Sequence, residues 1–218
     1  MRHATTLVLM AFFSLPVFGS DTKESVFWHW FQKNEERVFT FERDRDHVFD
    51  DLAAALQKVH SDLTFEFGPV GSAGRREFVI SAAGIQSAFP AVETLCSSAP
   101  ELKKWIIVKF RPRRSPINDL ELAGKKIRAS DVRCLLFRDE KPGKVGVMVF
   151  LNGYREGQRS AFAQYGYLFL DEALGEYDVE TRLGAIVFQG SDSKYFADAH
   201  PLADLANNFD DYFAKQIK

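Results

Sequence analysis

Apolar positions along this chain follow two different periods, and each change of period marks a change of predicted element. Between residues 48 and 59, apolar side chains recur every three or four positions, which predicts a helix with one apolar face. Residues 63–67, "LTFEF", alternate strictly between apolar and polar, which predicts a strand with one buried side. The glycine-rich "GPVGSAG" at 68–74 then predicts a turn, and "REFVISA" at 76–82 predicts the returning strand of a hairpin.

The remaining elements follow from the same two periods. Prolines in the first turn and just past the end delimit a helix at 84–100, and "KWIIVKF" at 104–110 predicts the next strand. The second half repeats this order. It predicts a small hairpin at 120–131, strands at 132–137 and 144–151, a helix at 159–175, a strand at 181–189 and a last helix at 201–216.

Each half therefore follows a β-β-α-β order with additional helices, which indicates the α+β class. We expect two related lobes, ferredoxin-like in character, with the helices packed on the sheets. The expected boundaries are 20–112 for the N-terminal lobe and 113–218 for the C-terminal lobe. One continuous domain is the alternative.

The stretch "FWHWF" at 27–31 places four aromatic residues in five positions. Ser25 is a suitable cap for a helix that runs to about Val38, and helical spacing places most of these rings on one apolar face. The segment is short and ends in acidic residues, so it does not suit a helix that lies on a membrane. We interpret most of the stretch as core. Trp28 lies beside the apolar face and is expected to line a groove.

The first residues of the chain indicate export. Arg2 precedes an apolar run from 4 to 18, and small residues suited to a signal peptidase follow it. The run spans about fifteen residues, whereas a membrane span needs about twenty. We therefore expect residues 1–19 to be a signal peptide and the mature protein to be periplasmic or secreted. Stable membrane insertion after cleavage is not expected.

Composition and charge narrow the classes of partner. The chain is 46% hydrophobic and 27% charged, which suits a globular protein with a sizeable core. The formal net charge is −2 and like charges do not form long runs, so a nucleic-acid partner is not expected. The basic stretch at 109–114 is interpreted as a strand end and a solvated loop. The histidines are scattered and the chain has no CxxC, so neither a metal nor a cofactor is expected.

The two cysteines allow two interpretations. Cys96 lies in a predicted helix and Cys134 in a predicted strand. In an oxidising compartment they could form one disulfide that closes a long loop. They could equally be two separate buried thiols, since both segments are apolar.

Catalytic signatures such as GxSxG, HExxH and the phosphate-binding loop are missing, which leaves acidic clusters as the candidates for chemistry. The segment "GEYDVET" carries Glu176, Asp178 and Glu180 at alternate positions. An extended backbone would project these three carboxylates to one side. Such a group binds a hard cation, raises the pKa of its members, or points into water and pairs with Arg182 or Arg155.

The polar face of the first predicted sheet is a second candidate. By alternation it carries Thr64, Glu66, Glu77 and Ser81, and the next strand can add Lys109 and Arg111. Ordinary ion pairing between neighbouring strands is one interpretation of these charges. The other is a ligand-binding face formed by Glu66, Lys109 and Arg111, with Trp28 and Trp105 as aromatic walls.

Several segments resemble a family of uncharacterised bacterial proteins. The resemblance is carried by "FWHWFQKNEE", "LTFEFGP", "REFVISAAGIQSAFPAVETL", "SAPELKKWIIVKFRP" and "LDEALGEYDVETRLG", and it runs from about Val26 to Asp211. It implies a shared fold and supplies no activity, ligand or catalytic residue.

These observations favour an exported, non-catalytic binding or protein-interaction protein of unknown ligand. The alternative is a carboxylate-dependent periplasmic hydrolase that uses Glu66 or Glu77 together with Glu176 or Glu180. Such an acid–base pair requires carboxyl groups about 5–10 Å apart in a cleft. A structural component of the cell envelope is a third class.

Overall fold

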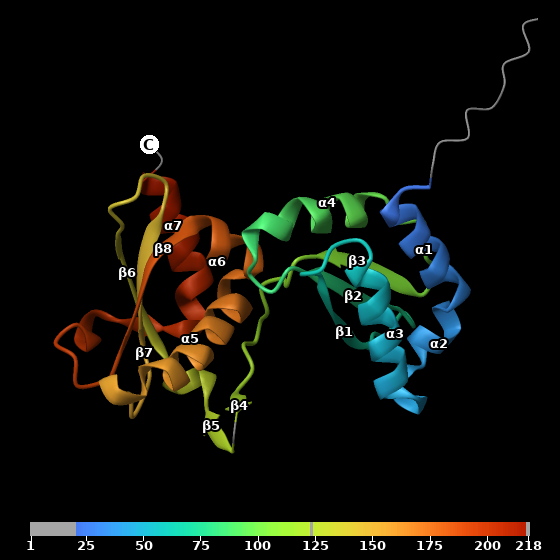
Figure 1. Cartoon of the computed structure of the whole chain (residues 1–218). Coiled ribbons are helices and arrows are strands. Elements are labelled where there is room, and N and C mark those ends of the chain that lie inside the picture. Colours follow the sequence, from blue (N-terminus) through green and yellow to red (C-terminus); the bar gives the residue numbers. More distant parts are fainter. Residues whose placement is uncertain (1–20, 123, 217–218) are drawn as a thin grey trace, which may run out of the picture.

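The computed structural model describes residues 21–122 and 124–216, in which helices and strands are mixed and the strands form several small sheets (Figure 1). The predicted signal peptide, residues 1–19, lies outside the described residues. Within the described residues, no helix is both long and apolar enough to cross a membrane. The mixture of helices and strands confirms the α+β class predicted from the sequence.

Buried apolar side chains form two separate clusters, and the parts of the chain around them are called the first and the second lobe below. The first lobe has a core between Phe27 and Phe110, and the second has a core between Ile127 and Phe209. Residues 111–119, the connecting segment, run between them (Figure 1).

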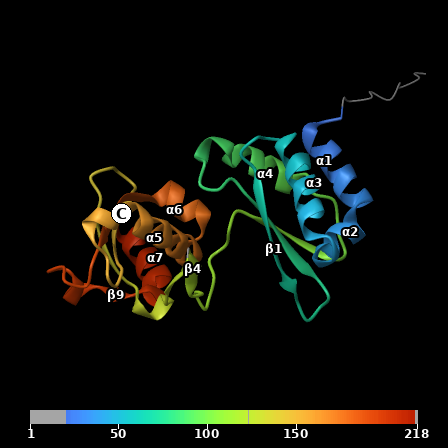
Figure 2. The ribbon, with the colours of Figure 1, turned by 60° about the horizontal axis from the view of Figure 1, so that its bottom comes forward.

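The first lobe contains a three-stranded sheet with helices on one face. Its strands lie in the order β1-β2-β3, with β1 and β2 antiparallel and β2 and β3 parallel. Phe78 and Ile80 on β2 join side chains from helices α1, α3 and α4 in one core, so these helices cover the same face of the sheet (Figure 2). The elements are α1 (Lys23–Lys33), α2 (Glu35–Phe39), α3 (Arg45–Gln57), β1 (Thr64–Val70), β2 (Arg76–Ser81), α4 (Phe89–Ser97) and β3 (Trp105–Lys109).

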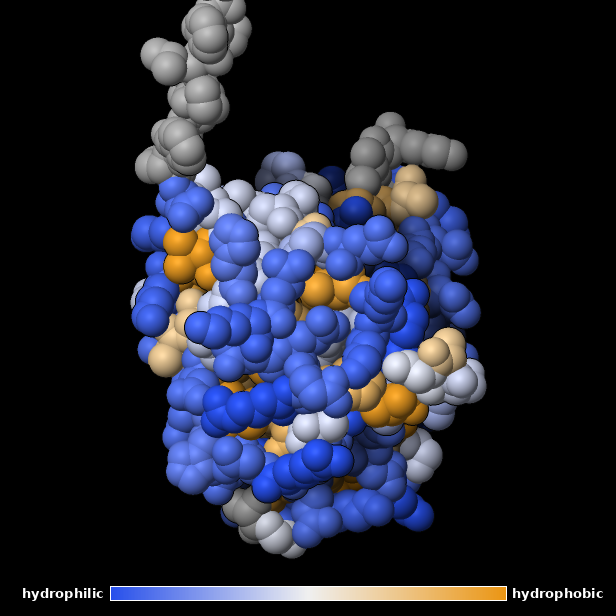
Figure 3. All heavy atoms as spheres, turned by 90° about the vertical axis from the view of Figure 1, so that its right-hand side faces the viewer, coloured by the Kyte–Doolittle hydropathy of each residue, from blue (hydrophilic) through white to orange (hydrophobic). Residues whose placement is uncertain are grey.

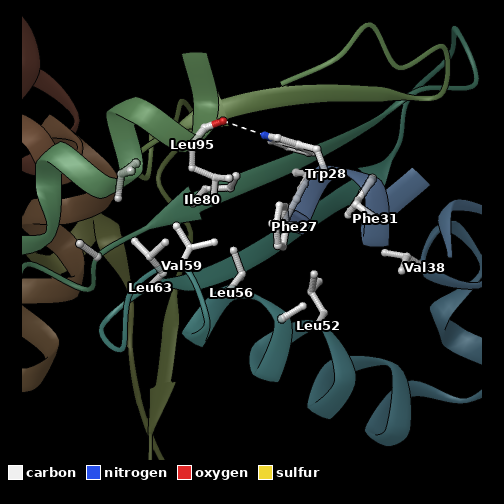
Figure 4. Close-up of a cluster of buried hydrophobic side chains, with 14 of the residues drawn as sticks. Phe27, Trp28, Phe31, Val38, Leu52, Leu56, Val59, Leu63, Ile80 and Leu95 are labelled. Atoms are coloured by element: carbon white, nitrogen blue, oxygen red, sulfur yellow. Dashed lines mark hydrogen bonds between the residues drawn. The ribbon is translucent and has the colours of Figure 1, made fainter. Parts of the chain in front are cut away.

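The stretch "FWHWF" supplies the centre of this core. Phe31 is fully buried and its ring stacks on that of Phe78 with centroids 5.0 Å apart. Trp28 is also buried, and its indole N–H donates a hydrogen bond to the carbonyl oxygen of Leu95 at 2.9 Å (Figure 4). The expectation that Trp28 lines a groove is therefore wrong, because the polar atom of this side chain is satisfied inside the lobe.

The outer surface of the first lobe agrees with this inward orientation. Figure 3 shows the side of the molecule that carries α1 and α2, where hydrophilic side chains predominate and apolar ones form separate spots. Scattered apolar residues of this kind are normal on a protein surface.

The second lobe contains an antiparallel strand pair, a helical segment and a third strand parallel to its neighbour. Its main sheet has the strand order β8-β7-β6-β9, with β6 and β7 antiparallel and β7 and β8 parallel. A separate two-stranded sheet pairs β4 with β5. The elements are β4 (Leu120–Leu122), β5 (Lys125–Ile127), β6 (Arg133–Arg138), β7 (Val145–Phe150), α5 (Arg159–Leu174), α6 (Glu176–Arg182), β8 (Leu183–Gln189), β9 (His200–Pro201) and α7 (Leu205–Gln216).

The two cysteines do not form a disulfide. Both thiols are free: Cys134 is buried in the core of the second lobe, and Cys96 packs against the core of the first. Burial raises the pKa of Cys96 to about 11 and that of Cys134 to about 12. The interpretation as two separate thiols therefore holds, and the disulfide interpretation is wrong.

Candidate functional site

The candidate site lies where the strand ends of the first lobe meet helix α6 of the second. Glu176, the first residue of α6, is fully buried between the lobes. Its Oε1 accepts hydrogen bonds from the backbone N–H groups of Ala82 and Gly84, both at 3.0 Å, and its Oε2 accepts one from Arg111 at 3.1 Å. The backbone N–H of Glu176 in turn donates to the carbonyl oxygen of Arg111 at 3.0 Å.

The loop after β2 is shaped to present these donors. Ala83 and Gly84 both have left-handed backbone angles, with φ of 49° and 82°, so the N–H groups around them converge on one point. Concave arrangements of backbone N–H groups of this kind bind anions. A Cβ at position 84 would lie 2.9 Å from the carboxylate of Glu180, which is a second reason for glycine there. The anion in this nest is the carboxylate of Glu176.

The helical conformation of α6 corrects the prediction for "GEYDVET". We expected an extended segment with three carboxylates on one side, whereas residues 176–182 form a helix that begins directly after Gly175. Asp178 pairs with Arg113 at 2.6 Å and with Arg182 at 3.1 Å, as the ion-pair alternative anticipated for Arg182. Within the described residues, no group of three His, Cys, Asp or Glu side chains is placed to hold a metal ion.

Arginines of the connecting segment link the acidic residues of both lobes. Nε of Arg111 lies 2.6 Å from Oε1 of Glu66 in the first lobe, and its Nη1 lies 3.4 Å from Oδ2 of Asp171 in the second. Arg114 pairs with Glu77 at 2.9 Å. These pairs neutralise much of the basic stretch, which is therefore committed to contacts within the chain.

A small hollow opens beside Arg111. Its volume is about 290 Å³, and acidic, basic and apolar side chains line it together. The lining residues are Glu66, Arg111, Pro112, Arg114, Asn118, Leu120, Leu168, Asp171 and Glu172. A hollow of this size admits a small polar molecule or a single side chain and is at the lower limit for ligand pockets.

Asp171 is an acid of this hollow whose pKa is raised. Burial raises the pKa of Asp171 to about 6, although Arg111 opposes the rise, and the nearby charges of Glu176 and Glu180 add to it. Burial also raises the pKa of Glu180, whose side chain lies against Gly84. A carboxyl group with a raised pKa is half-protonated at mildly acidic pH and can donate or accept a proton there.

Replacement of Asp171 by asparagine is expected to stabilise the protein at neutral pH. Because the folded state holds the Asp171 proton more tightly than the unfolded state, the wild type loses stability as pH rises from about 4 to about 6. Asp171→Asn removes that loss and keeps an oxygen for Arg111, so we expect a gain of about 1–2 kcal/mol at pH 7. Urea unfolding at pH 4, 5, 6 and 7 measures it. A difference between variant and wild type that stays constant over this range would contradict the assignment.

The structure brings together some of the predicted site residues and separates the others. Glu66, Arg111, Glu176 and Glu180 meet at the junction, and Glu77 lies at the same junction through Arg114. Lys109 does not join them. It is paired in register with Ile80 and contacts Glu93 of α4 at 3.5 Å, so it lies on the helix-covered face.

Trp105 is not an aromatic wall of the hollow. It is buried in the core of the first lobe, where its ring lies 5.3 Å from that of Phe31. An indole in this position has no surface left for a ligand. The aromatic walls predicted for the polar face are therefore absent from the described residues of this site.

Asp171 is the site residue that the sequence analysis missed. It lies one helical turn before Gly175 in "LDEALG", on a helix that otherwise follows an apolar pattern. Its position three residues before the helix end at Leu174 was the available signal, since an acidic side chain near a helix C-terminus is unfavourable without a basic partner. That partner, Arg111, is 60 residues away in sequence.

Comparison of this chain with family models, with curated proteins and with solved structures gives no match. The resemblance to a bacterial family consequently remains a prediction.

Proposed function

We propose that this protein is an exported, non-catalytic binding protein that acts by engaging another macromolecule. The observation that carries the proposal is the state of Glu176, the most buried of the four candidate catalytic carboxylates. Both of its oxygens are occupied by backbone donors, two from the first lobe and one from the connecting segment. A carboxylate held by three N–H groups serves to join two parts of a chain, and Glu176 is not among the residues that line the hollow beside Arg111.

The other candidate acids support the same proposal. Glu66 and Glu77 each form an ion pair with an arginine of the connecting segment. A general base needs access to the proton that it removes, and these groups are held against permanent positive charges instead. The junction is thus better suited to hold the lobes together than to transform a substrate.

A carboxylate-dependent hydrolase is the second candidate, and one observation favours it. Glu66 and Asp171 contact the same guanidinium group, so their carboxyl groups lie within about 9 Å of each other, the range that inverting hydrolases use. The raised pKa of Asp171, about 6, would suit a general acid. This pair differs from the pairs predicted from the sequence, since Asp171 replaces Glu176 and Glu180.

A hydrolase panel separates the two candidates. We expect purified protein to give no turnover of glycoside, ester, peptide or phosphoester substrates between pH 5 and 8. Glu66→Gln and Asp171→Asn serve as matched variants, because each keeps the shape of the side chain and removes its charge. Turnover by the wild type that both variants abolish would establish the hydrolase and end the binding proposal.

Two further parts of the proposal concern origin and location. The order of hairpin, helix and parallel third strand in both lobes supports related units of ferredoxin-like character. The apolar run at 4–18 supports a periplasmic or secreted location after removal of residues 1–19. N-terminal sequencing of the protein recovered from cells tests the location, because an unprocessed Met1 would contradict export.

A further inference from the structure

Strand β6 has an open edge. It pairs with β7 along its whole length, whereas β9 pairs with it only at Arg133 and Cys134. On the β9 side, the carbonyl oxygen of Val132 accepts a hydrogen bond from the N–H of Leu202 at 3.0 Å. Backbone groups of alternate residues point the same way in an antiparallel strand, so those of Leu136 and Arg138 also point to this side.

The described part of the chain leaves most of this edge without a paired strand. Among the described strands, none pairs with β6 beyond Cys134 on that side, and the turn Phe196–Asp198 that precedes β9 lies near β6 without forming a strand beside it. Phe196 in that segment packs instead on Phe150, with ring centroids 5.7 Å apart. Figure 1 shows β6 at the outer margin of the second lobe.

The open edge is also apolar, with the sequence Leu135-Leu136-Phe137. Natural proteins normally protect such an edge with a charge, a proline or a bulge, because unpaired backbone groups readily recruit another strand. The six residues of β6 contain neither a proline nor a bulge, and their charges lie only at the two ends. An edge of this kind is suited to accept a strand.

A groove runs along this edge, between β6 and helix α7. Its volume is about 250 Å³, and Leu136, Leu205 and Tyr212 form its apolar part. At the end of β6, Arg138 and Lys215 together line the adjoining hollow at the β6–β7 turn. A strand edge beside a helix is the arrangement by which several peptide-binding domains add an extended peptide to a sheet.

The end of the groove at Arg138 is positively charged. Arg138 and Lys215 are both exposed, and neither forms an ion pair with another described residue. Two acids line the adjoining hollow as well. Asp139 is committed to the backbone N–H groups of Lys141 at 2.7 Å and Ala185 at 2.6 Å, and the exposed Glu140 is outnumbered by Arg138, Lys141 and Lys215. Asp211 lies one turn before Lys215 and lines the groove nearer its middle, so an acidic ligand group is favoured only at the Arg138 end.

We propose that this groove binds an extended segment of a partner protein, which joins the second sheet as a strand antiparallel to β6. The direction follows from β9, which is antiparallel to β6 on the same side. The N-terminal end of the segment then lies at Arg138 and Lys215 and carries an acidic residue. Two positions later, an apolar side chain on the same face packs against Leu136 and Tyr212. This inference rests on the proposed binding function and names its partner class.

A peptide library displayed on phage tests the proposal, with an acidic residue fixed at one position and an aliphatic residue fixed two positions later. A selected peptide is synthesised and its affinity for the purified protein is measured by calorimetry. We expect the double variant Arg138→Glu, Lys215→Glu to lower the affinity by about tenfold or more. Lys103→Glu, an exposed charge reversal on the first lobe, is the matched control and is expected to leave the affinity unchanged.

N-methylation of the peptide tests the strand geometry without changing the protein. A methyl group on the amides that face β6 removes the donors, and we expect binding to be lost. Methylation of the alternate amides leaves the donors in place, and binding should persist. A peptide for which both methylated forms bind equally would overturn strand addition.

Other outcomes are equally decisive. If selected peptides bind but are insensitive to the Arg138 and Lys215 reversals, this groove is excluded while the binding function stands. If light scattering shows that two copies associate and the reversals abolish the association, the occupant is a second copy and the proposed partner is wrong. Turnover in the hydrolase panel would instead overturn the underlying function.

Discussion

Replacement of Glu176 by alanine is expected to lower the free energy of unfolding by about 3 kcal/mol, because it leaves three backbone donors without their acceptor in a buried place. The N–H groups of Ala82 and Gly84 belong to the first lobe and that of Arg111 to the connecting segment, whereas the carboxylate comes from the second lobe. The loss should therefore appear as a weakened association of the lobes. Urea unfolding monitored by tryptophan fluorescence measures it, since Trp28 and Trp105 lie in the first core.

Two companion variants make this result specific. Glu176→Gln keeps one oxygen as an acceptor but turns an amide group toward a backbone donor. Its free energy of unfolding should therefore lie between those of the wild type and the alanine variant. Glu140→Ala removes an exposed carboxylate at the β6–β7 turn and is expected to change stability by less than about 0.5 kcal/mol. Equal stability of Glu176→Ala and Glu140→Ala would show that the buried carboxylate contributes nothing.

Replacement of Phe31 by alanine is expected to cost about 3–5 kcal/mol, the usual range for a large aromatic residue in a packed core. Phe31 is fully buried, and its ring contacts those of Trp28, Phe78 and Trp105. Alanine would leave a cavity at the place where α1 meets the sheet. The same unfolding experiment reports the loss.

The control for Phe31 lies on the same helix. Val26 is 49% exposed, so Val26→Ala removes apolar atoms that are largely in water already. We expect its effect to be below about 0.5 kcal/mol. If the two substitutions cost the same, the helix would not be held by its aromatic face.

The order of helices and strands could largely be predicted from the sequence, because burial on one side imposes a period on the chain. The alternation at 63–67 predicted a strand, and β1 spans Thr64–Val70. The glycines at 68–74 predicted the turn that joins β1 to β2. In each case the signal is local, since neighbouring side chains are sorted by the core that they face.

The contacts between the lobes could not be predicted in this way. The buried side chain at the start of α6, Glu176, is held by donors at Ala82 and Gly84, more than ninety residues earlier in the chain. The acceptor for Trp28 is Leu95, 67 residues away. Lys109 lies on the helix-covered face because β3 runs parallel to β2 in a particular register, which alternation within one strand does not reveal. Such features depend on pairs of distant residues.

The position of Glu176 has a consequence for how this chain can change over evolutionary time. The nest at Ala82–Gly84 and the acid that fills it lie in different halves of the sequence, so neither half is free to drift independently at this point. A duplication or exchange that moved one half into another gene would separate the Glu176 carboxylate from the backbone N–H groups that bind it. Either half alone would accordingly keep only one side of this contact, the backbone donors or the buried carboxylate.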